Sequence, residues 1–271
     1  MGNVRDPRLD GALRAVAGDW LAGLDATQVF ALNGYRPDPW QVEVLRTPSK
    51  RVLLLAPRQS GKGLTCAALA LWHALFRPGS TTIVTAPSQR QAAELLEKVR
   101  RLLRPFSGRF PLSGESALAL SWRSGSRLLT LPGKPDTIRG YTPDVAIVDE
   151  ASYTPDELYV AIRPMLTVSG GKLVAISSAG PRRGWFFREW EDGGSEWTRI
   201  KSTSLDNPRV PPEELEAQRL TLGPTRFARE HLSEFVDEVE DAERNPFAFA
   251  GMKDLLDEAF ADAIVPLEEG R

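Results

Sequence analysis

The chain has 271 residues and a mass of 29.9 kDa, enough for one or two domains with buried cores. Charged residues at 26% and hydrophobic residues at 42% are ordinary for a soluble globular protein, and the net charge of −2 means that any basic surface must be local. The single cysteine, Cys66, excludes a disulfide framework, and the separation of His73 from His231 gives no zinc-ligand spacing. No membrane-spanning apolar run or secretory leader is visible, so we expect a protein of the cytosol.

The N-terminal segment predicts helices. Residues 8–32 place apolar side chains at helical spacing, and an extended turn follows at residues 35–40, where two prolines flank Asp38. A short helix is predicted from Gln41 to about Pro48. In motor ATPases a glutamine and an aromatic residue upstream of the phosphate loop often contact adenine, which makes Gln41 a candidate, with Trp40 or Tyr35 as the stacking partner. A polar helix cap beside a core tryptophan is the alternative.

The next segment has the pattern of a phosphate-binding loop. The apolar run 52–56 predicts a buried strand, residues 64–72 predict a buried helix, and Arg58-Gln59-Ser60-Gly61-Lys62-Gly63 lies between them. In such a loop, backbone N–H groups and the helix N-terminus face an anion while the lysine reaches the outer phosphates. Two departures leave a plain strand-to-helix turn open: Ala56 stands where the pattern has glycine, and Gly63 where it has a magnesium-binding hydroxyl.

The middle of the chain alternates strands and helices. We expect a strand at 81–86, a helix at 88–103, a loop at 105–116, a hairpin of strands 118–123 and 127–131, and a second loop at 133–143.

A second strand decides how the loop is interpreted. Residues 145–148 are apolar and run directly into Asp149 and Glu150. An aspartate there suits magnesium, and the longer glutamate can polarise an attacking water. The lysine loop and this acidic pair, in the order of an α/β fold, together favour a nucleotide triphosphate site.

The last third of the chain first completes the predicted core and then becomes rich in charged residues. A helix at 154–165, a strand at 172–179, a helix at 185–190 and a strand at 197–202 are predicted. After residue 207, two charged helices that start near Pro211 and Thr225 suggest a small helical lid. An acidic segment follows and has the composition of a tail or linker, which suggests that the chain is a fragment of a longer protein.

These motifs resemble, in order, those of the ATPase domain of bacteriophage large terminase subunits, over residues 30–205. The resemblance rests on the arginine and glutamine of Arg58-Gln59-Ser60-Gly61-Lys62, on Trp40-Gln41, on the strand into Asp149-Glu150-Ala151, and on Ser177-Ser178-Ala179. It implies a RecA-like (ASCE-type) α/β P-loop NTPase with a central, mostly parallel sheet, an additional strand between the loop strand and the acidic strand, and a small helical lid with a C-terminal linker. The implied divisions are 1–49 for N-terminal helices and adenine contact, 50–206 for the ATPase core, 207–250 for the lid, and 251–271 for a linker towards a missing nuclease domain.

The resemblance also implies roles for residues. Lys62 would neutralise the β- and γ-phosphates of ATP, Asp149 would hold Mg²⁺, Glu150 would orient the water, and Ser177 and Ser178 would couple γ-phosphate loss to the lid. With glycine at 63, Mg²⁺ would depend on Asp149, waters, or Thr65 one turn later. The remaining nucleotide contacts would come from the loop and the start of its helix: Arg58, Gln59, Ser60, Gly61, Gly63 and Leu64.

Two arginines compete to be the arginine finger that stabilises the transferring phosphoryl group. Arg58 could act within its own subunit, and Arg139, on an exposed loop, could reach the next subunit of a ring; we favour Arg139. Non-specific DNA contact through phosphates is expected from an arginine cluster, although a solvated helix face is the alternative. Its members are Arg100, Arg101 and Arg104, with Arg123 or Arg127 on the hairpin.

The implied function is ATP hydrolysis that drives double-stranded viral DNA into a procapsid, with a homo-oligomeric ring on the capsid portal and a small terminase subunit as partners. The site of action would be the host cytoplasm, transiently at the portal vertex. The sequence contains no carboxylate cluster of the kind that holds the two metal ions of a nuclease, so we expect no DNA cleavage by this chain. A DEAD-related helicase or translocase and a nucleotide-binding scaffold without turnover are the competing hypotheses.

Overall fold

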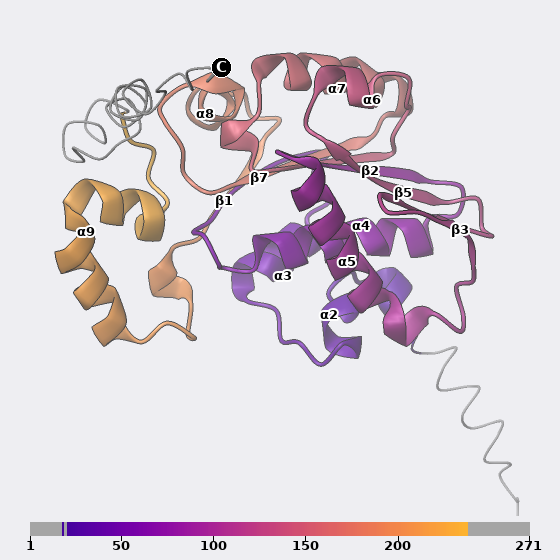
Figure 1. The fold of residues 1–271 in the computed structure, drawn as a ribbon, viewed down its shortest axis with the longest axis horizontal. Coiled ribbons are helices and arrows are strands. Elements are labelled where there is room, and N and C mark those ends of the chain that lie inside the picture. The colour runs from indigo at the N-terminus through magenta and orange to yellow at the C-terminus, as the bar shows by residue number, and fades with distance from the viewer. Residues whose placement is uncertain (1–17, 19–20, 238–271) are drawn as a thin grey trace, which may run out of the picture.

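The computed structural model of the chain describes residue 18 and residues 21–237. This part of the chain forms one eight-stranded sheet with helices on both faces (Figure 1). None of its helices combines the length and the apolar character that crossing a bilayer requires.

The sheet is mostly parallel and has the order β3-β4-β5-β2-β6-β7-β1-β8. In this order, all neighbouring strands from β5 through β2, β6, β7 and β1 to β8 are parallel. The strand β4 is antiparallel to both β3 and β5. β7 lies between β1, which leads into the lysine loop, and β6, which ends in the acidic pair, so the RecA-like order expected from the resemblance is confirmed. The strands are β1 (Arg51–Leu55), β2 (Thr81–Ala86), β3 (Leu112–Glu115), β4 (Ala119–Trp122), β5 (Arg127–Pro132), β6 (Val145–Asp149), β7 (Lys172–Ser177) and β8 (Thr198–Lys201).

The helices cover the sheet in two layers. In Figure 1, α2 to α5 lie on one face, α6 to α8 on the other, and α9 to one side. The α-helices are α2 (Gln28–Leu32), α3 (Pro39–Arg46), α4 (Lys62–Phe76), α5 (Gln89–Leu103), α6 (Pro135–Ile138), α7 (Asp156–Ser169), α8 (Gly184–Glu191) and α9 (Pro212–Leu232). Short 3₁₀ turns are η1 (Arg104–Phe106), η2 (Ala151–Tyr153) and η3 (Ser204–Asp206).

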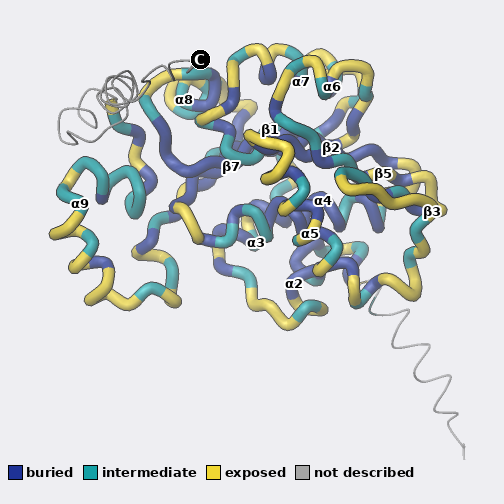
Figure 2. The backbone as a smooth tube through the Cα atoms, viewed as in Figure 1, coloured by how far each residue is buried: buried dark blue, intermediate teal, exposed yellow. Residues whose placement is uncertain are grey.

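Two hydrophobic cores result from the alternation of side chains along the strands. In β1, Val52 and Leu54 face the core with α4 and α5, whereas Leu53 and Leu55 face the core with α7 and α8. Both faces of the strand are therefore buried, as the dark interior of Figure 2 shows. Burying each such leucine contributes about 2 kcal/mol, which holds the start of the loop rigidly in place.

The single helix predicted over residues 8–32 is wrong in the part that the structure describes, because the helix is interrupted before α2. Asp25 Oδ1 accepts a hydrogen bond from the backbone N–H of Thr27 at 3.0 Å, a local turn that interrupts the helix before α2. Leu24, predicted on the inner face, is 78% exposed. The other apolar positions of this prediction, Leu9, Leu13, Val16 and Trp20, lie outside the described residues.

Two segments predicted as loops contain regular structure. Residues 105–116 include part of η1 and the strand β3, whose residues are largely exposed and whose pairing with β4 is a long-range contact that composition does not reveal. Residues 133–143 include the single turn α6, which Pro135 begins. The predicted hairpin of β4 and β5 is confirmed.

The two charged helices predicted after residue 207 form one kinked helix, α9. Gly223 has φ 72° inside α9, and Pro224 follows it, so two helical arms meet at a bend. The second arm ends at Leu232 rather than at Val236, because Ser233 adopts the left-handed conformation with φ 54°. The rest of the predicted lid, 238–250, and the predicted linker, 251–271, lie outside the described residues.

Candidate active site

The lysine loop joins β1 to α4 and is shaped by two residues in the left-handed region. Gln59 has φ 58°, and Gly61 has φ 100° and caps α4. Ser60 donates to the carbonyl of Pro57 at 2.8 Å, which closes the loop on itself. The N-terminus of α4, a helix of 15 residues, therefore faces the concave side of the loop, where an anion can bind.

Lys62 lies buried across this loop. Its Nζ donates to the carbonyls of Ala56 at 2.9 Å and Pro57 at 2.7 Å. Burial lowers the pKa of Lys62, and the carboxylates of Glu150 and Asp149 act in the opposite direction. An ammonium held only by neutral carbonyls is available to an anion that enters the loop.

The acidic pair stands at the carboxyl end of β6. Asp149 is the last residue of the strand, and Glu150 follows with φ 51°, an unfavourable conformation for a residue with a side chain. The Glu150 N–H donates to Asp149 Oδ1 at 3.1 Å. Burial, together with the neighbouring Glu150 charge, raises the pKa of Asp149 to about 6. The charges of Lys62 and Lys98 act in the opposite direction and favour the ionised carboxylate.

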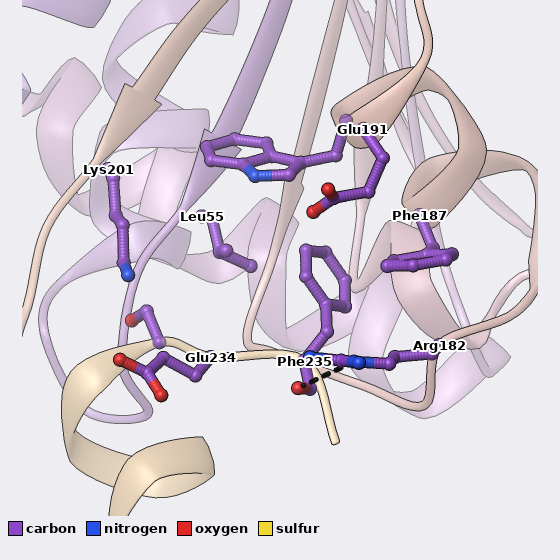
Figure 3. A pocket seen from close by; sticks show the side chains of 9 residues that line it. Leu55, Arg182, Phe187, Glu191, Lys201, Glu234 and Phe235 are labelled. Carbon is purple, nitrogen blue, oxygen red and sulfur yellow. Dashed lines mark hydrogen bonds between the residues drawn. The ribbon is translucent and has the colours of Figure 1, made fainter. Parts of the chain in front are cut away.

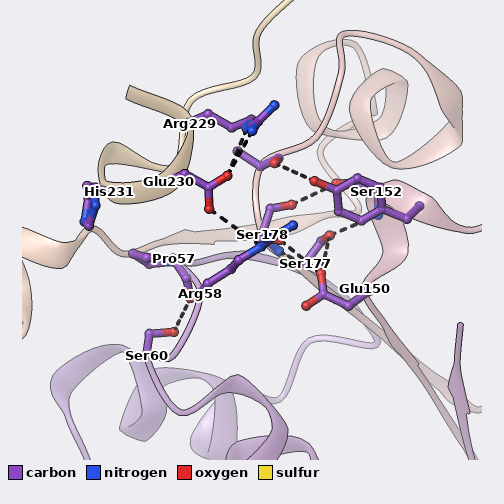
Figure 4. A network of polar contacts seen from close by, with 12 residues as sticks. Pro57, Arg58, Ser60, Glu150, Ser152, Ser177, Ser178, Arg229, Glu230 and His231 are labelled. Carbon is purple, nitrogen blue, oxygen red and sulfur yellow. Dashed lines mark hydrogen bonds and ion pairs between the residues drawn. The ribbon is translucent and has the colours of Figure 1, made fainter. Parts of the chain in front are cut away.

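The end of β7 contacts Glu150 (Figure 4). Ser178 Oγ donates to Glu150 Oε2 at 3.0 Å, and Ser177 Oγ and the Ser178 N–H approach the same oxygen at 3.4 Å. Ser152 in turn donates to the carbonyl of Ser178 at 3.1 Å. The two serines predicted as a coupling motif thus hold the predicted water-orienting carboxylate.

One cleft of about 750 Å³ brings most of the predicted residues together. A volume of this order is typical of small-molecule and cofactor sites. The predicted residues that line it are Tyr35, Arg58, Gln59, Gly61, Lys62, Gly63, Leu64, Asp149 and Glu150.

Four predicted nucleotide contacts do not line the cleft: Ser60, whose hydroxyl is turned to the Pro57 carbonyl, and Trp40, Gln41 and Thr65. Trp40 is 7% exposed and packs in the core of α4 and α5, so Tyr35 is the aromatic residue placed at the cleft. Gln41 is buried behind the loop, where its Oε1 accepts from the Asp38 N–H at 2.8 Å and its Nε2 donates to Thr65 Oγ1 at 3.0 Å. Thr65 also donates to the Gly61 carbonyl at 3.2 Å, so its hydroxyl braces the loop from beneath.

The two candidate fingers differ in position. Arg58 lines the cleft, and its Nε lies 3.6 Å from Glu230 of α9 (Figure 4). Arg139 lies outside the cleft residues, with 69% of its side chain exposed and an ion pair to Asp136 at 3.2 Å. Gly140, next to it, has φ 90°. Arg139 therefore has no contact with the cleft of its own chain.

The predicted DNA-contact arginines do not form one cluster. Arg100 is neutralised by Glu97 and by Glu115, the latter at 2.7 Å. Arg101 lines the nucleotide-sized cleft, and Arg104 is exposed at the end of α5. Arg127 is exposed at the beginning of β5, beside Thr81, with Arg123 exposed in the preceding turn. These last two lie at the amino ends of the parallel strands, away from the cleft.

One wall of the cleft was not predicted from the sequence. A stripe on α5 contributes Gln91, Glu94, Leu95, Lys98 and Arg101, and Pro87 and Tyr153 also line it. The spacing of three and four residues along α5 was visible in the sequence, but nothing local shows that this face meets the loop.

Other candidate features lie apart from this site. A second pocket, of about 290 Å³, lies where the chain after α9 passes α8 and contains Arg182, Glu191, Lys201 and Phe235 (Figure 3). It includes none of the predicted site residues. Cys66 is fully buried, as predicted for a core residue. Within the described part of the chain, no three His, Cys, Asp or Glu residues are grouped as metal ligands.

Comparison with known proteins connects this geometry to a family. A family model described as "Terminase large subunit, T4likevirus-type, N-terminal" matches residues 53–249. The large terminase subunit of Thermus virus P23-45 is 29% identical over 245 residues, which cover 76% of this chain and 50% of that protein. The corresponding subunit of Escherichia phage T5 is 26% identical over 225 residues, covering 78% and 51%. The chain thus spans about half the length of these curated relatives.

Solved structures agree. The large terminase ATPase domain of Thermus phage P74-26 superposes with a TM-score of 0.66 at 26% identity, covering 76% of this chain and 97% of that one. The HK97 bacteriophage large terminase, at 18% identity and a TM-score of 0.58, shares the fold over 82% of this chain and 52% of its own. With a family model that matches most of its length, with the loop and the acidic pair in one cleft, and with β7 between the strands that carry them, the chain belongs to the family of terminase large subunits, of which it represents the N-terminal part.

Proposed function

We propose that this chain is a Mg²⁺-dependent ATPase. The observation that carries the proposal is that Lys62, Asp149 and Glu150, from the ends of two strands separated by β7, line the same cleft. Support also comes from the similarity to the P74-26 ATPase domain, which extends over almost the whole of that domain.

The chemistry of the donor groups fits a magnesium ion. Asp149 is a buried carboxylate whose pKa is raised by burial and by the neighbouring Glu150 charge, and Mg²⁺ prefers one or two carboxylates together with waters and phosphate oxygens. Thr65 is engaged by Gln41 and the Gly61 carbonyl, so Asp149 is the better candidate ligand. When bound, the ion supplies charge that offsets the charge developing on the phosphates during transfer.

Different residues of the cleft would bind the phosphates, orient the water and contact the adenine. Lys62 exchanges its two carbonyl partners for β- and γ-phosphate oxygens, and the N–H groups of the loop bind the remaining phosphate oxygens. Glu150 orients the attacking water and is positioned by Ser178. Tyr35 offers a half-exposed ring at the mouth of the cleft, where adenine can stack. Gln41 acts indirectly, by bracing the loop through Thr65.

We assign the finger to Arg139 in trans. It is exposed, lies outside its own cleft and stands on the connection from β5 to β6, the strand that ends in Asp149. Arg58 then serves as a sensor, because it lies between the loop and Glu230 of α9. Loss of the γ-phosphate at Glu150, Ser178 and Arg58 would be transmitted to α9 through this ion pair.

For the whole protein, the proposed role is the packaging of double-stranded DNA into a procapsid. The relatives are large terminase subunits of phages, and this role implies a ring on the portal, a small terminase subunit and action in the host cytoplasm. Exposed Arg104, Arg123 and Arg127 are candidates for DNA phosphate contact, whereas Arg100, paired with two glutamates, is a weaker one.

The test is steady-state phosphate release by the wild type, Lys62→Ala and Glu150→Gln. We expect Mg²⁺-dependent turnover in the wild type and a loss of at least about a hundredfold in both variants, with Glu150→Gln still binding nucleotide. A wild type that binds nucleotide without turnover would overturn the ATPase proposal in favour of the scaffold hypothesis. No specific observation favours the helicase alternative.

A further inference from the structure

Gly63 is a glycine without a backbone reason to be one. It is the second residue of α4, with ordinary helical geometry, whereas the neighbouring Gly61 has φ 100°. Glycine in a helix costs about 1 kcal/mol relative to alanine. A side chain at position 63 would point towards the loop, since Cα–Cβ bonds in a helix tilt to its N-terminus. In the standard phosphate loop a hydroxyl occupies this place and binds magnesium.

The space left by Gly63 is filled by a lysine from another helix. A Cβ on residue 63 would lie 2.6 Å from Nζ of Lys98 and 3.7 Å from its Cε. Lys98 comes from α5 and is one of the residues that line the cleft, together with Lys62 and Asp149. The ammonium group therefore stands where the loop would otherwise carry its own hydroxyl.

No group of the described chain binds the Lys98 ammonium directly, although its charge favours the ionised form of Asp149. Lys98 forms no hydrogen bond or ion pair with another described residue, although an exposed glutamate, Glu94, stands one turn before it on α5. Glu94 instead lies 3.7 Å from Arg90. An ammonium without a hydrogen-bonded protein partner, directed at a helix N-terminus that itself favours anions, adds a positive charge to the loop side of the cleft.

We propose that Lys98 is a second phosphate-binding lysine, whose ammonium, seated in the space that Gly63 leaves, donates to the outer phosphate oxygens of the bound nucleotide. This inference rests on the proposed function, since it concerns the same cleft. An ammonium cannot ligate a metal ion, so Lys98 replaces part of the charge neutralisation of the hydroxyl-bound ion and not its coordination. The nucleotide should consequently depend less on Mg²⁺ for binding here than in a loop with a hydroxyl.

The test is equilibrium binding of fluorescent ADP and of ATPγS to the purified chain, in excess Mg²⁺ and in EDTA. Lys98→Met keeps the length of the side chain and removes the charge. We expect it to weaken binding about tenfold or more in EDTA, the loss of one charge-assisted hydrogen bond, and less in Mg²⁺. Lys98→Arg should restore much of the affinity. Lys50→Met, an exposed lysine just before β1 at the opposite end of the strand, is the matched control and should bind as the wild type does.

A double-mutant cycle tests the pairing of Gly63 with Lys98. Gly63→Ser should displace the ammonium and weaken binding in EDTA, and the loss should not add to that of Lys98→Met in the double variant. The double variant should also bind nucleotide with a stronger Mg²⁺ dependence than the wild type. Equal affinities of Lys98→Met and Lys50→Met in EDTA and in Mg²⁺ would overturn the inference. If Lys62→Met abolishes binding while Lys98→Met does not change it, the proposed function stands and only this inference fails. A wild type that binds neither nucleotide would overturn both.

Discussion

At the scale of single residues, the site depends on groups held in unfavourable states. Glu150 has a positive φ, and its carboxylate is held by Ser178. Asp149 has a raised pKa, and Lys62 is buried against carbonyls. States of this kind each cost free energy, and they persist because the surrounding strands are buried on both faces. They indicate a site prepared for an anion and a cation together.

The contact between Ser178 and Glu150 predicts a defect in turnover without a defect in binding. Removing the hydroxyl by Ser178→Ala should lower kcat by roughly tenfold, since a general base that loses its positioning keeps only part of its effect. Nucleotide affinity should change less than twofold, because Ser178 is not among the residues that line the cleft. Ser80→Ala, a buried hydroxyl at the start of β2 that donates to the His73 carbonyl, is the control. An unchanged kcat in Ser178→Ala would contradict the positioning role.

His73 predicts how stability depends on pH. Burial, with the charges of Lys172 and Arg77 nearby, lowers the pKa of His73 to about 4, whereas the unfolded chain keeps a value near 6.5. Between these two values the unfolded state binds a proton that the folded state does not, so stability falls as the pH falls from 6.5 towards 4. The contribution is at most about 3 kcal/mol. Urea unfolding at pH 7 and pH 5 should show a smaller loss in His73→Gln than in the wild type; equal losses would contradict the assignment.

At the scale of elements, α9 has few buried residues for its length. Only Leu215 and Phe227 of its 21 residues are buried, and the helix bends at Gly223. Its second arm is connected to the ATPase core by the Arg58–Glu230 pair and by His231, whose ring lies 3.0 Å from Ser204 Oγ. An element with few buried contacts opens at low cost, which suits a lid that follows the state of the nucleotide.

Glu230→Gln should therefore loosen this arm without unfolding the protein. The pair with Arg58 is partly exposed and long, so the change in global stability should stay below about 1 kcal/mol. Hydrogen exchange in residues 225–232 should become faster, while exchange in α4 stays as in the wild type. Glu213→Gln, the same charge change in the exposed first turn of α9, provides the comparison. Identical exchange in the two variants would show that the ion pair does not restrain the arm.

At the scale of the whole molecule, the order of the strands separates two ends. The carboxyl ends of β1 and β6 lead into the nucleotide-sized cleft, and Arg127 stands at the amino end of β5, beside that of β2. Arg139 belongs to neither place and faces solvent. Because Arg139 is exposed on the connection from β5 to β6, it is positioned to complete a site on a neighbouring copy.

Mixing variants tests this arrangement. Arg139→Ala and Lys62→Ala should each be nearly inactive in DNA-stimulated ATP hydrolysis by the assembled protein. If Arg139 acts in trans, an equimolar mixture should regain about a quarter of the wild-type rate, since a working site needs Lys62 from one subunit and Arg139 from the next. Arg58→Ala replaces Arg139→Ala in the control mixture. Recovery in neither mixture, or in the control alone, would contradict the assignment of Arg139.

The sequence by itself determined what depends on neighbours along the chain. The buried strand before Arg58, the helix after Lys62 and the apolar run into Asp149 follow from local pattern, and the family resemblance of these motifs implied the RecA-like sheet. Glycine at 61 and the acidic pair at a strand end have local physical reasons, so the loop and the acids were found. The strand β3 was missed because its pairing with β4 leaves little trace in four largely exposed residues.

Only the tertiary structure decided which faces meet. Periodicity shows that Lys98 and Arg101 share a face of α5, but the packing of α5 beside α4 puts that face over Gly63. The same holds for Trp40, buried in the core while Tyr35 reaches the cleft, and for Thr65, turned beneath the loop towards Gln41. The physical reason is that a helix or strand pattern specifies the direction of a side chain relative to its own axis. Its distance from a group far along the chain is set by how the layers pack.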